Sequence, residues 1–279
     1  MITGATSGIG LATATALAAR GARLVMVGRD PDRSERARAE VAAASDSGQV
    51  TVLMADLASL ASIRALAGHF LDTYDRLDVL INDAGVFEQR RHLSADGLEM
   101  TLAVNLVAPF YLTSLLLDRL RASAPARIVN VSSATQRTAT IDVTDLQFER
   151  RRYWMQTAYS QSKLGVLLFT KELARRLSGT GVTANAVHPG FVRTRLGSRG
   201  GLLSIAWALG RPLMISPEAA ARTSVYVSTS PDVATVTGAY FVDSRPAAVN
   251  PPADDPELAS QLWQQLEKLA PAHPTASVA

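Results

Sequence analysis

The chain has 279 residues, a formal net charge of +3 and no cysteine, and 47% of its residues are hydrophobic. A chain of this length can bury a large core without cross-links. The lack of cysteine excludes disulfides, thiolate metal sites and cysteine nucleophiles, and it is compatible with a reducing cytoplasm.

The composition also argues against membrane-spanning and nucleic-acid-binding proteins. No stretch approaches the roughly 20 apolar residues that a membrane span needs. The only run of three arginines, Arg150-Arg151-Arg152, has no aromatic-rich binding motif beside it and predicts a solvated loop. We therefore expect no membrane span, no nucleic-acid partner and no metal site.

A glycine-rich loop, Thr3-Gly4-Ala5-Thr6-Ser7-Gly8-Ile9-Gly10, opens the chain. Its glycines let the backbone turn and approach a ligand closely. The alanine-rich segment 11–20 has an apolar face and predicts a helix. Because a helix N-terminus favours anions, this loop predicts a site for the pyrophosphate of a dinucleotide, and a simple glycine turn is the alternative. The candidate cofactor-binding residues here are Gly4, Thr6, Ser7, Gly8, Ile9 and Gly10.

Only Met1 and Ile2 precede this loop. A Rossmann unit needs a central strand of about five residues at this point. We therefore expect a truncated first strand, and hypothesise that the natural chain starts several residues earlier. Since there is no room for a signal peptide before this loop, we expect a cytoplasmic location.

The second predicted strand, 23–27, ends in Gly28-Arg29. A carboxylate at this position would bind the ribose of NAD and repel a 2′-phosphate. Gly28 followed by a guanidinium favours NADP, although Arg29 can also simply start a solvated turn. A helix over 34–44 and a third strand over 50–54 follow. Asp56 and Leu57 then lie where an adenine would bind, or Asp56 is only a helix cap.

The middle of the chain alternates helices and strands, with small or polar residues after the strands. Helices are predicted over 62–74 and 98–120, and strands over 77–81, 126–131 and 182–187. Asn82-Asp83-Ala84-Gly85 follows the fourth strand, Ser132-Ser133 the fifth, and His188-Pro189-Gly190 the sixth. Asn105 lies inside the long helix, where it either holds a water at a deformed turn or bonds its neighbours. The segment 134–157 is expected to be a surface excursion beside the substrate mouth.

Tyr159 and Lys163 are four residues apart, on one face of a helix that continues to Leu177. A nearby ammonium lowers the pKa of a phenol from about 10, which makes it usable as a general acid or base. Taken alone, the pair is more often an ordinary surface Tyr and Lys. The surrounding motifs favour the catalytic interpretation of this pair.

The last part of the chain contains a glycine-flanked apolar segment, 191–216, predicted to be a substrate lid. A buried helix or a membrane-facing patch is the alternative there. A helix over 217–227 capped by Ser216, a last strand over 239–242, a helix over 256–269 and a disordered tail over 271–279 are expected. The whole pattern predicts a single α/β domain over 1–279, doubly wound and Rossmann-type, with a mostly parallel sheet of seven strands.

In their order and spacing, these motifs resemble the short-chain dehydrogenase/reductase family over almost the whole chain. The resemblance rests on the glycine loop, Asn82 to Gly85, Asn105, Ser133, the Tyr159–Lys163 stretch and Pro189-Gly190. Residues 159–177, Asp145-Leu146-Gln147 and Gly238-Ala239-Tyr240-Phe241 make it most similar to the retinol dehydrogenase branch. Asp83 departs from the family pattern, which has a second Asn there.

The resemblance implies roles for individual residues. Tyr159 would exchange a proton with the substrate oxygen, Ser133 would bond that oxygen, and Lys163 would lower the tyrosine pKa and hold the nicotinamide ribose. Asn105 would support a water leading to Lys163. The remaining cofactor contacts would come from Asn82, Ala84, Gly85, Pro189, Gly190, Val192 and Thr194.

We therefore expect an NADP-preferring oxidoreductase that interconverts an alcohol and a ketone or aldehyde on an apolar small molecule. An NAD-linked alcohol dehydrogenase is the second reading, and a nucleotide-sensing regulator without turnover is the third. The resemblance leaves a homo-oligomer open, and the sequence does not identify the substrate.

Overall fold

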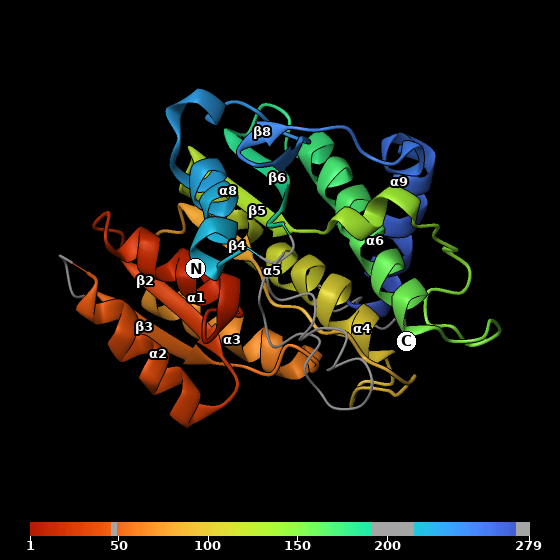
Figure 1. Ribbon diagram of the computed structural model, residues 1–279, viewed down its shortest axis with the longest axis horizontal. Coiled ribbons are helices and arrows are strands. Elements are labelled where there is room, and N and C mark those ends of the chain that lie inside the picture. The colour runs from red at the N-terminus through yellow and green to blue at the C-terminus, as the bar shows by residue number, and fades with distance from the viewer. Residues whose placement is uncertain (46–48, 191–214, 272–279) are drawn as a thin grey trace, which may run out of the picture.

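The computed structural model describes residues 1–45, 49–190 and 215–271 and is built around one twisted sheet (Figure 1). The strand order is β3-β2-β1-β4-β5-β6-β7-β8. The strands are β1 (Ile2–Thr3), β2 (Leu24–Gly28), β3 (Val50–Met54), β4 (Val79–Asn82), β5 (Ala126–Val131), β6 (Val182–His188), β7 (Tyr240–Val242) and β8 (Arg245–Pro246). Every pair is parallel except β7 with β8. The predicted α/β fold with a mostly parallel sheet is confirmed.

Over the described residues the sheet has eight strands, one more than the seven expected. β8 is a two-residue strand that pairs antiparallel with β7 at the edge of the sheet. Asp243 and Ser244 join the two strands, and both have positive φ, 49° and 60°. Two positive φ values are what a tight two-residue hairpin turn requires, but Asp-Ser is not the Asn-Gly signal that usually announces one.

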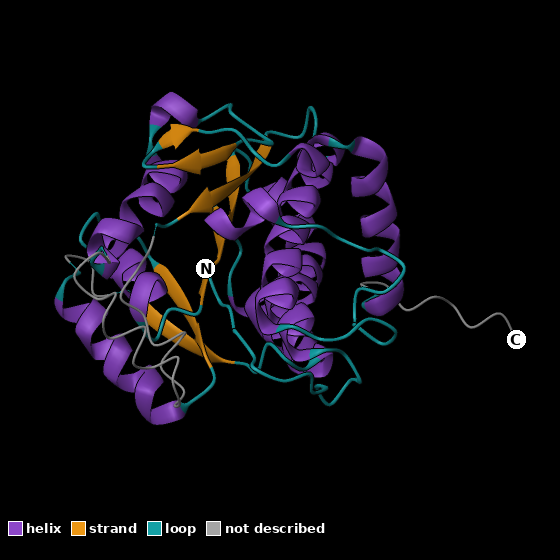
Figure 2. Cartoon of the chain, turned by 45° about the vertical axis from the view of Figure 1, so that its right-hand side comes forward, coloured by secondary structure: helices purple, strands orange, loops and turns teal. Residues whose placement is uncertain are grey.

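Helices cover both faces of the sheet (Figure 2). One face carries α1 (Gly8–Ala18), α2 (Pro31–Ala43) and α8 (Pro217–Thr229). The other carries α3 (Leu60–Thr73), α5 (Ala108–Ala122), α6 (Met155–Arg176) and α9 (Pro256–Leu269). Alternate strand residues serve the two cores: Leu24 and Met26 face one, Val25 and Val27 the other. This sidedness is the doubly wound arrangement that the alternation of elements predicted.

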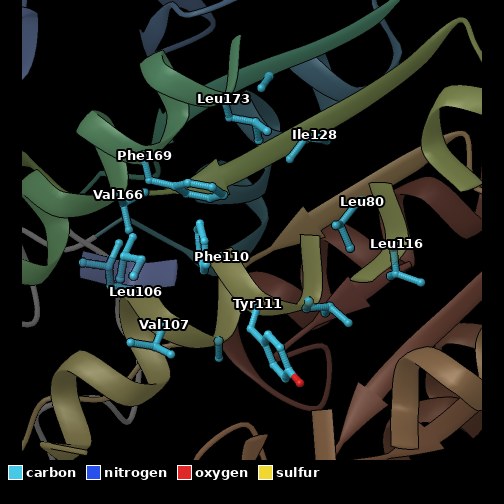
Figure 3. Close-up of a cluster of buried hydrophobic side chains, with 14 of the residues drawn as sticks. Leu80, Leu106, Val107, Phe110, Tyr111, Leu116, Ile128, Val166, Phe169 and Leu173 are labelled. Carbon is cyan, nitrogen blue, oxygen red and sulfur yellow. The ribbon is translucent and has the colours of Figure 1, made fainter. Parts of the chain in front are cut away.

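The core on the second face is rich in aromatic and leucine side chains (Figure 3). The Phe110 ring lies 5.7 Å from the Phe169 ring and 5.0 Å from the Trp263 ring, both edge-on. These three residues join α5, α6 and α9. The helix that carries Tyr159 and Lys163 is thereby held between two neighbours.

β1 is as short as expected, but it occupies the central position of the sheet. Ile2 pairs with Met26 and Ile81, and Thr3 with Val27 and Asn82. The amino group of Met1 donates a hydrogen bond to the Val79 carbonyl at 2.7 Å, and its burial lowers its pKa to about 5. These pairings place the glycine loop between β2 and β4.

The long helix expected over 98–120 is interrupted. It consists of a short α4 (Met100–Leu102), a π-helical turn η1 (Ala103–Val107) and then α5. Pro109, four residues after Asn105, has no N–H to donate to the Asn105 carbonyl, which explains why the regular ladder fails here. By length and composition Met100–Ala122 could cross a membrane, but 78% of its most apolar window is buried inside the protein. It is a core helix.

The C-terminal elements agree with the expected ones where they are described. Ser216 caps α8 by accepting a hydrogen bond from the Ala219 N–H at 3.2 Å. The predicted lid, 191–216, lies outside the described residues except for its last two positions, and so does the predicted tail except for Pro271.

Candidate active site

The candidate residues gather at the carboxyl ends of the central strands. The glycine loop follows β1, Asp83 to Gly85 follow β4, and Ser133 follows β5. α6 brings Tyr159 and Lys163 to the same edge, and the π-helical turn brings Asn105. In open α/β sheets this edge, where the strand order reverses, is where ligands bind.

The glycine loop forms a close-packed cradle for a ligand. Gly4 has φ +69° and lies against Ala84, whose Cα would be 2.8 Å from a Cβ added at position 4. A Cβ on Gly10 would lie 2.4 Å from the Gly4 carbonyl oxygen. α1 begins at Gly8, earlier than expected, and the hydroxyl of its N-cap Ser7 makes no capping bond. This helix end therefore fits a dinucleotide pyrophosphate, which needs close backbone approach and free N–H groups.

The end of β2 has no room for an acidic side chain. A Cβ at Gly28 would lie 2.1 Å from Ser34 Oγ. The next side chain, Arg29, is 67% exposed and lies 3.7 Å from the Asp56 carboxylate, which is itself 46% exposed. The structure thus places both predicted adenosine-site residues together, with most of the guanidinium open to solvent.

Asp56 is not the cap of α3. Ser59 is, because its hydroxyl accepts from the Ser62 N–H, whereas Asp56 Oδ1 accepts from the Ala58 N–H at 3.0 Å in a tight turn. Leu57 follows in the same turn and is partly buried. The capping alternative for Asp56 is wrong, and the second carboxylate oxygen stays available.

The turn after β4 is held by hydrogen bonds to the neighbouring strand β1. Thr3 Oγ1 accepts from the N–H groups of Asp83 and Ala84. Asn82 is buried, and its amide donates to Asn130 Oδ1 at 2.8 Å and to Thr113 Oγ1 at 3.2 Å. The Asn82 side chain, predicted to contact the cofactor, therefore points into the protein and ties β4 to β5 and α5.

Asn105 locks the loop that follows Gly85. Its Oδ1 accepts from the Val86 N–H at 2.7 Å, and its amide donates to the Val86 carbonyl at 3.0 Å and to Ser162 Oγ at 3.1 Å. A Cβ on Gly85 would lie 3.4 Å from Asn105 Oδ1 and 3.7 Å from Lys163 Nζ. Gly85 thus keeps open the space between Asn105 and Lys163, where the predicted water would lie.

Of the two serines after β5, only Ser133 faces the site. Ser132 is buried, and its hydroxyl donates to the Lys163 carbonyl at 2.8 Å. Ser133 is partly exposed and makes a side-chain hydrogen bond with Tyr159. The hydroxyls of Ser133 and Tyr159 can therefore contact the same substrate oxygen.

The pKa of Tyr159 differs from the expectation. Burial raises it to about 12, the hydrogen bond with Ser133 lowers it, and the charge of Asp83 raises it further. Lys163 Nζ lies 5.6 Å from the Tyr159 ring centroid and donates instead to the Val131 carbonyl at 2.9 Å. The predicted lowering of the phenol pKa by Lys163 is therefore wrong for the protein without cofactor.

Among the described residues, Lys163 and Asp83 are charged groups that act on each other beside Tyr159. Burial lowers the pKa of Lys163 to about 8, and the carboxylate of Asp83 raises it. Burial raises the pKa of Asp83 to about 7, against the charge of Lys163 and the Gly10 N–H, which lower it. From the sequence, Asp83 is recognised as a departure from the family pattern, but no role is predicted for its side chain.

The excursion 134–157 is pinned to the catalytic helix. Gln161 donates to the Leu146 carbonyl and accepts from Arg151. Burial tends to raise the pKa of Asp145, but N–H groups of Glu149, Arg151 and Arg150 and the Arg151 guanidinium outweigh it and hold that pKa at about 2. The excursion is thus fixed two residues beyond Tyr159.

The arginine run folds back on its own loop. Arg150 donates to Thr144, Arg151 pairs with Asp145, and Arg152 stacks 4.3 Å from the Trp154 ring centroid. All three guanidinium groups therefore have intramolecular partners, in keeping with the loop predicted for them.

Phe87 is a site residue that sequence reasoning missed. Its ring meets the Tyr159 ring edge-on, with centroids 4.8 Å apart and an interplanar angle of 85°. Edge-on contacts of this kind orient both rings. Its position after Gly85 was the available signal, but nothing in the local pattern predicted contact with a helix 72 residues later.

The predicted nicotinamide-binding residues are only partly described. Gly190 has φ +88°, and its N–H meets His188 Nδ1 at 3.4 Å, so the Pro189-Gly190 turn is formed. Burial, with the charge of Arg137, lowers the pKa of His188. Val192 and Thr194 lie outside the described residues.

Comparison with known proteins decides which family uses this arrangement. The sequence profile of short chain dehydrogenases matches residues 1–200. This chain is a member of the short-chain dehydrogenase family. It is therefore a dehydrogenase/reductase of class EC 1.1.1.-, and the family implies an NAD(P) cofactor.

Relatives in the short-chain dehydrogenase family include several retinol dehydrogenases. Human retinol dehydrogenase 13 is 42% identical over 279 residues, covering 96% of this chain and 83% of its own length. Human retinol dehydrogenase 12 and mouse retinol dehydrogenase 14 are each 44% identical, over 94% of this chain and 83% of theirs. The predicted similarity to the retinol dehydrogenase branch is confirmed.

Solved structures agree with the family assignment. A putative uncharacterized protein from Mycobacterium paratuberculosis matches with a TM-score of 0.79 and 34% identity, over 96% of this short-chain dehydrogenase and 91% of that chain. The Pseudomonas aeruginosa RhlG/NADP active-site complex matches with a TM-score of 0.69 and 26% identity, over 86% and 92%.

Proposed function

We propose that this short-chain dehydrogenase interconverts an apolar alcohol and the corresponding aldehyde or ketone, with NADP as its preferred cofactor. The observation that carries the proposal is one grouping: Tyr159, Ser133, Lys163 and Asn105 lie together beside the glycine cradle. A proton donor, a second hydroxyl for the substrate oxygen and an anion-binding helix end are the parts that hydride chemistry at a carbonyl needs from a protein.

Each of the four residues has a separate role in the proposed reaction. The cofactor supplies the hydride when it is bound. Tyr159 keeps its proton at neutral pH and donates it to the carbonyl oxygen, which Ser133 also hydrogen-bonds. Lys163 places a positive charge beside them, and Asn105 holds Val86 and the space next to Gly85. The raised phenol pKa keeps Tyr159 protonated, as carbonyl reduction requires at its start, but it also makes the phenol a weaker acid than one with a pKa near neutral; alcohol oxidation requires the phenolate.

The preference for NADP rests on Arg29. Its guanidinium is largely exposed at the end of β2, and position 28 itself carries no carboxylate, while the Asp56 carboxylate lies 3.7 Å from the guanidinium. We expect Arg29→Ala to weaken NADPH binding about tenfold or more, and NADH binding by less than about threefold, because only NADPH offers a phosphate.

The Arg29 prediction is checked by fluorescence titration of both cofactors. Arg33→Ala, one turn into α2 and exposed, is the matched control for a general loss of positive charge. Equal losses for NADPH and NADH in Arg29→Ala would favour the NAD-linked alternative.

An apolar substrate is supported by the surroundings of Tyr159 and by the relatives. Phe87 forms an apolar wall against its ring, and the relatives at 42–44% identity are named retinol dehydrogenases. A panel of retinoid, aliphatic and aromatic aldehydes and ketones, followed by NADPH absorbance, tests this. Turnover confined to small polar carbonyls would contradict it.

The alternative function is a nucleotide sensor without turnover. Such a protein would bind NADPH and leave the whole panel of carbonyl compounds unreduced.

The cytoplasmic location remains a prediction. Cell fractionation with an antibody against this protein tests it.

A further inference from the structure

Asp83 places an acidic side chain where the cofactor cradle meets the reaction centre. One carboxylate oxygen accepts a hydrogen bond from the Gly10 N–H, in the first turn of α1. Oδ2 would lie 2.7 Å from a Cβ added at Gly10. Oδ1 is closed off from solvent and has no hydrogen-bond partner among the described residues. A buried oxygen without a donor is costly for a charged carboxylate.

In the part of the chain that the structure describes, few ionisable groups act on Asp83. From α6, Lys163 faces it with a positive charge and Tyr159 with a neutral phenol. α1 (Gly8–Ala18) carries no titratable side chain, and the neighbouring Thr3 and Gly4 are neutral. Burial raises the pKa of Asp83 to about 7, so both protonation states are populated near neutral pH in the free protein.

A dinucleotide pyrophosphate at the start of α1 would add negative charge close to this carboxylate. Both anions would then use the N–H groups of the same helix turn. Repulsion disfavours the charged carboxylate, and the protonated form also gives one oxygen an O–H to donate.

We propose that binding of the anionic dinucleotide is coupled to uptake of one proton from solvent by the Asp83 carboxylate. The proposal rests on the proposed function, since it requires the cofactor to bind at the glycine loop. Its sign follows from linkage. The bound state has the higher pKa, so affinity is greatest below the free-state pKa and falls as pH rises towards the bound-state pKa.

The first experiment measures proton uptake by the unmodified protein. NADPH is titrated calorimetrically at about pH 7.5 in two buffers of different ionisation enthalpy. The difference in heat gives the protons bound per cofactor. We expect uptake of roughly half a proton or more, and no uptake would overturn the proposal.

The second experiment assigns the proton to Asp83. Lys163 and the 2′-phosphate of NADPH also titrate in this range, so Lys163→Met is compared with Lys163→Met/Asp83→Asn, using NADPH and NADH. Because the charge of Lys163 lowers the pKa of Asp83, Lys163→Met raises that pKa, and in the single variant we expect Kd to rise by up to about tenfold per pH unit only above the raised pKa. Asn mimics the protonated carboxyl, so the double variant should lose that part of the dependence with both cofactors.

The outcomes separate this proposal from the function. Identical pH dependence of Kd in the two proteins would overturn the role of Asp83 and leave the function intact. No binding of NADPH or NADH by the wild-type protein at any pH would overturn the function itself. If the double variant fails to fold, Asp83→Asn alone is titrated in the same two buffers, and proton uptake equal to that of the wild-type protein overturns the role of Asp83.

Discussion

Tyr159→Phe is expected to lower kcat by about 10²–10⁴-fold, the range that a positioned general acid contributes. The variant removes one oxygen and leaves the ring, so its edge-on contact with Phe87 should persist. Binding of NADPH should change by less than about threefold, because the cofactor cradle is formed by other elements. Steady-state reduction of the best carbonyl of the panel measures kcat, and fluorescence titration measures binding.

Tyr226→Phe is the matched control for Tyr159→Phe. Tyr226 lies on α8, on the opposite face of the sheet, next to Phe241. Its loss of a hydroxyl should leave kcat unchanged. If both variants turn over at the wild-type rate, Tyr159 is not the proton donor.

Lys163→Met is expected to lower kcat by about 10²–10³-fold, as the loss of one preorganised electrostatic contact does. It removes the positive charge beside Tyr159 and Asp83 and the hydrogen bond to the Val131 carbonyl. Unlike Tyr159→Phe, it should also weaken the cofactor, because Lys163 is proposed to hold the nicotinamide ribose. Kinetics and NADPH titration on the same protein measure both effects.

The matched control for Lys163→Met lies on the same helix. Lys171→Met removes an ammonium two turns later that pairs with Asp254 at the surface. This change should leave kcat and the Kd of NADPH within about twofold of wild type, since exposed ion pairs contribute little. A Lys163→Met protein with normal kcat would show that the ammonium has no part in the reaction.

Local patterns predicted the elements well, because hydrophobic alternation and glycine spacing act over short distances. The Gly4 to Gly10 loop, β2, β3 and α6 lie where the sequence indicates. The break in the long helix was also encoded locally, by Pro109 four residues after Asn105, but only the structure shows that a π-helical turn results. β8 depends on an Asp-Ser turn that carries no strong sequence signal.

The electrostatics of the site could not be read from spacing. The four-residue interval places Tyr159 and Lys163 on one helix face but does not say where Nζ points, and Nζ is hydrogen-bonded to Val131. The two effects that raise the pKa of Tyr159, its burial and the charge of Asp83, come from elements other than α6. Asn82 shows the same limit, since a motif position predicted to serve the cofactor has a side chain directed into the protein.

We expect Tyr159 to become a proton-exchanging phenol when the oxidised cofactor fills its site. The most direct measurement is the ultraviolet difference spectrum of phenolate, wild type minus Tyr159→Phe, across pH with and without oxidised cofactor. In the free protein the pKa of Tyr159 is about 12, so no phenolate should form below about pH 10. With the positively charged nicotinamide bound, we expect phenolate to appear near neutral pH, and a spectrum unchanged by the cofactor would show that Tyr159 does not take this role.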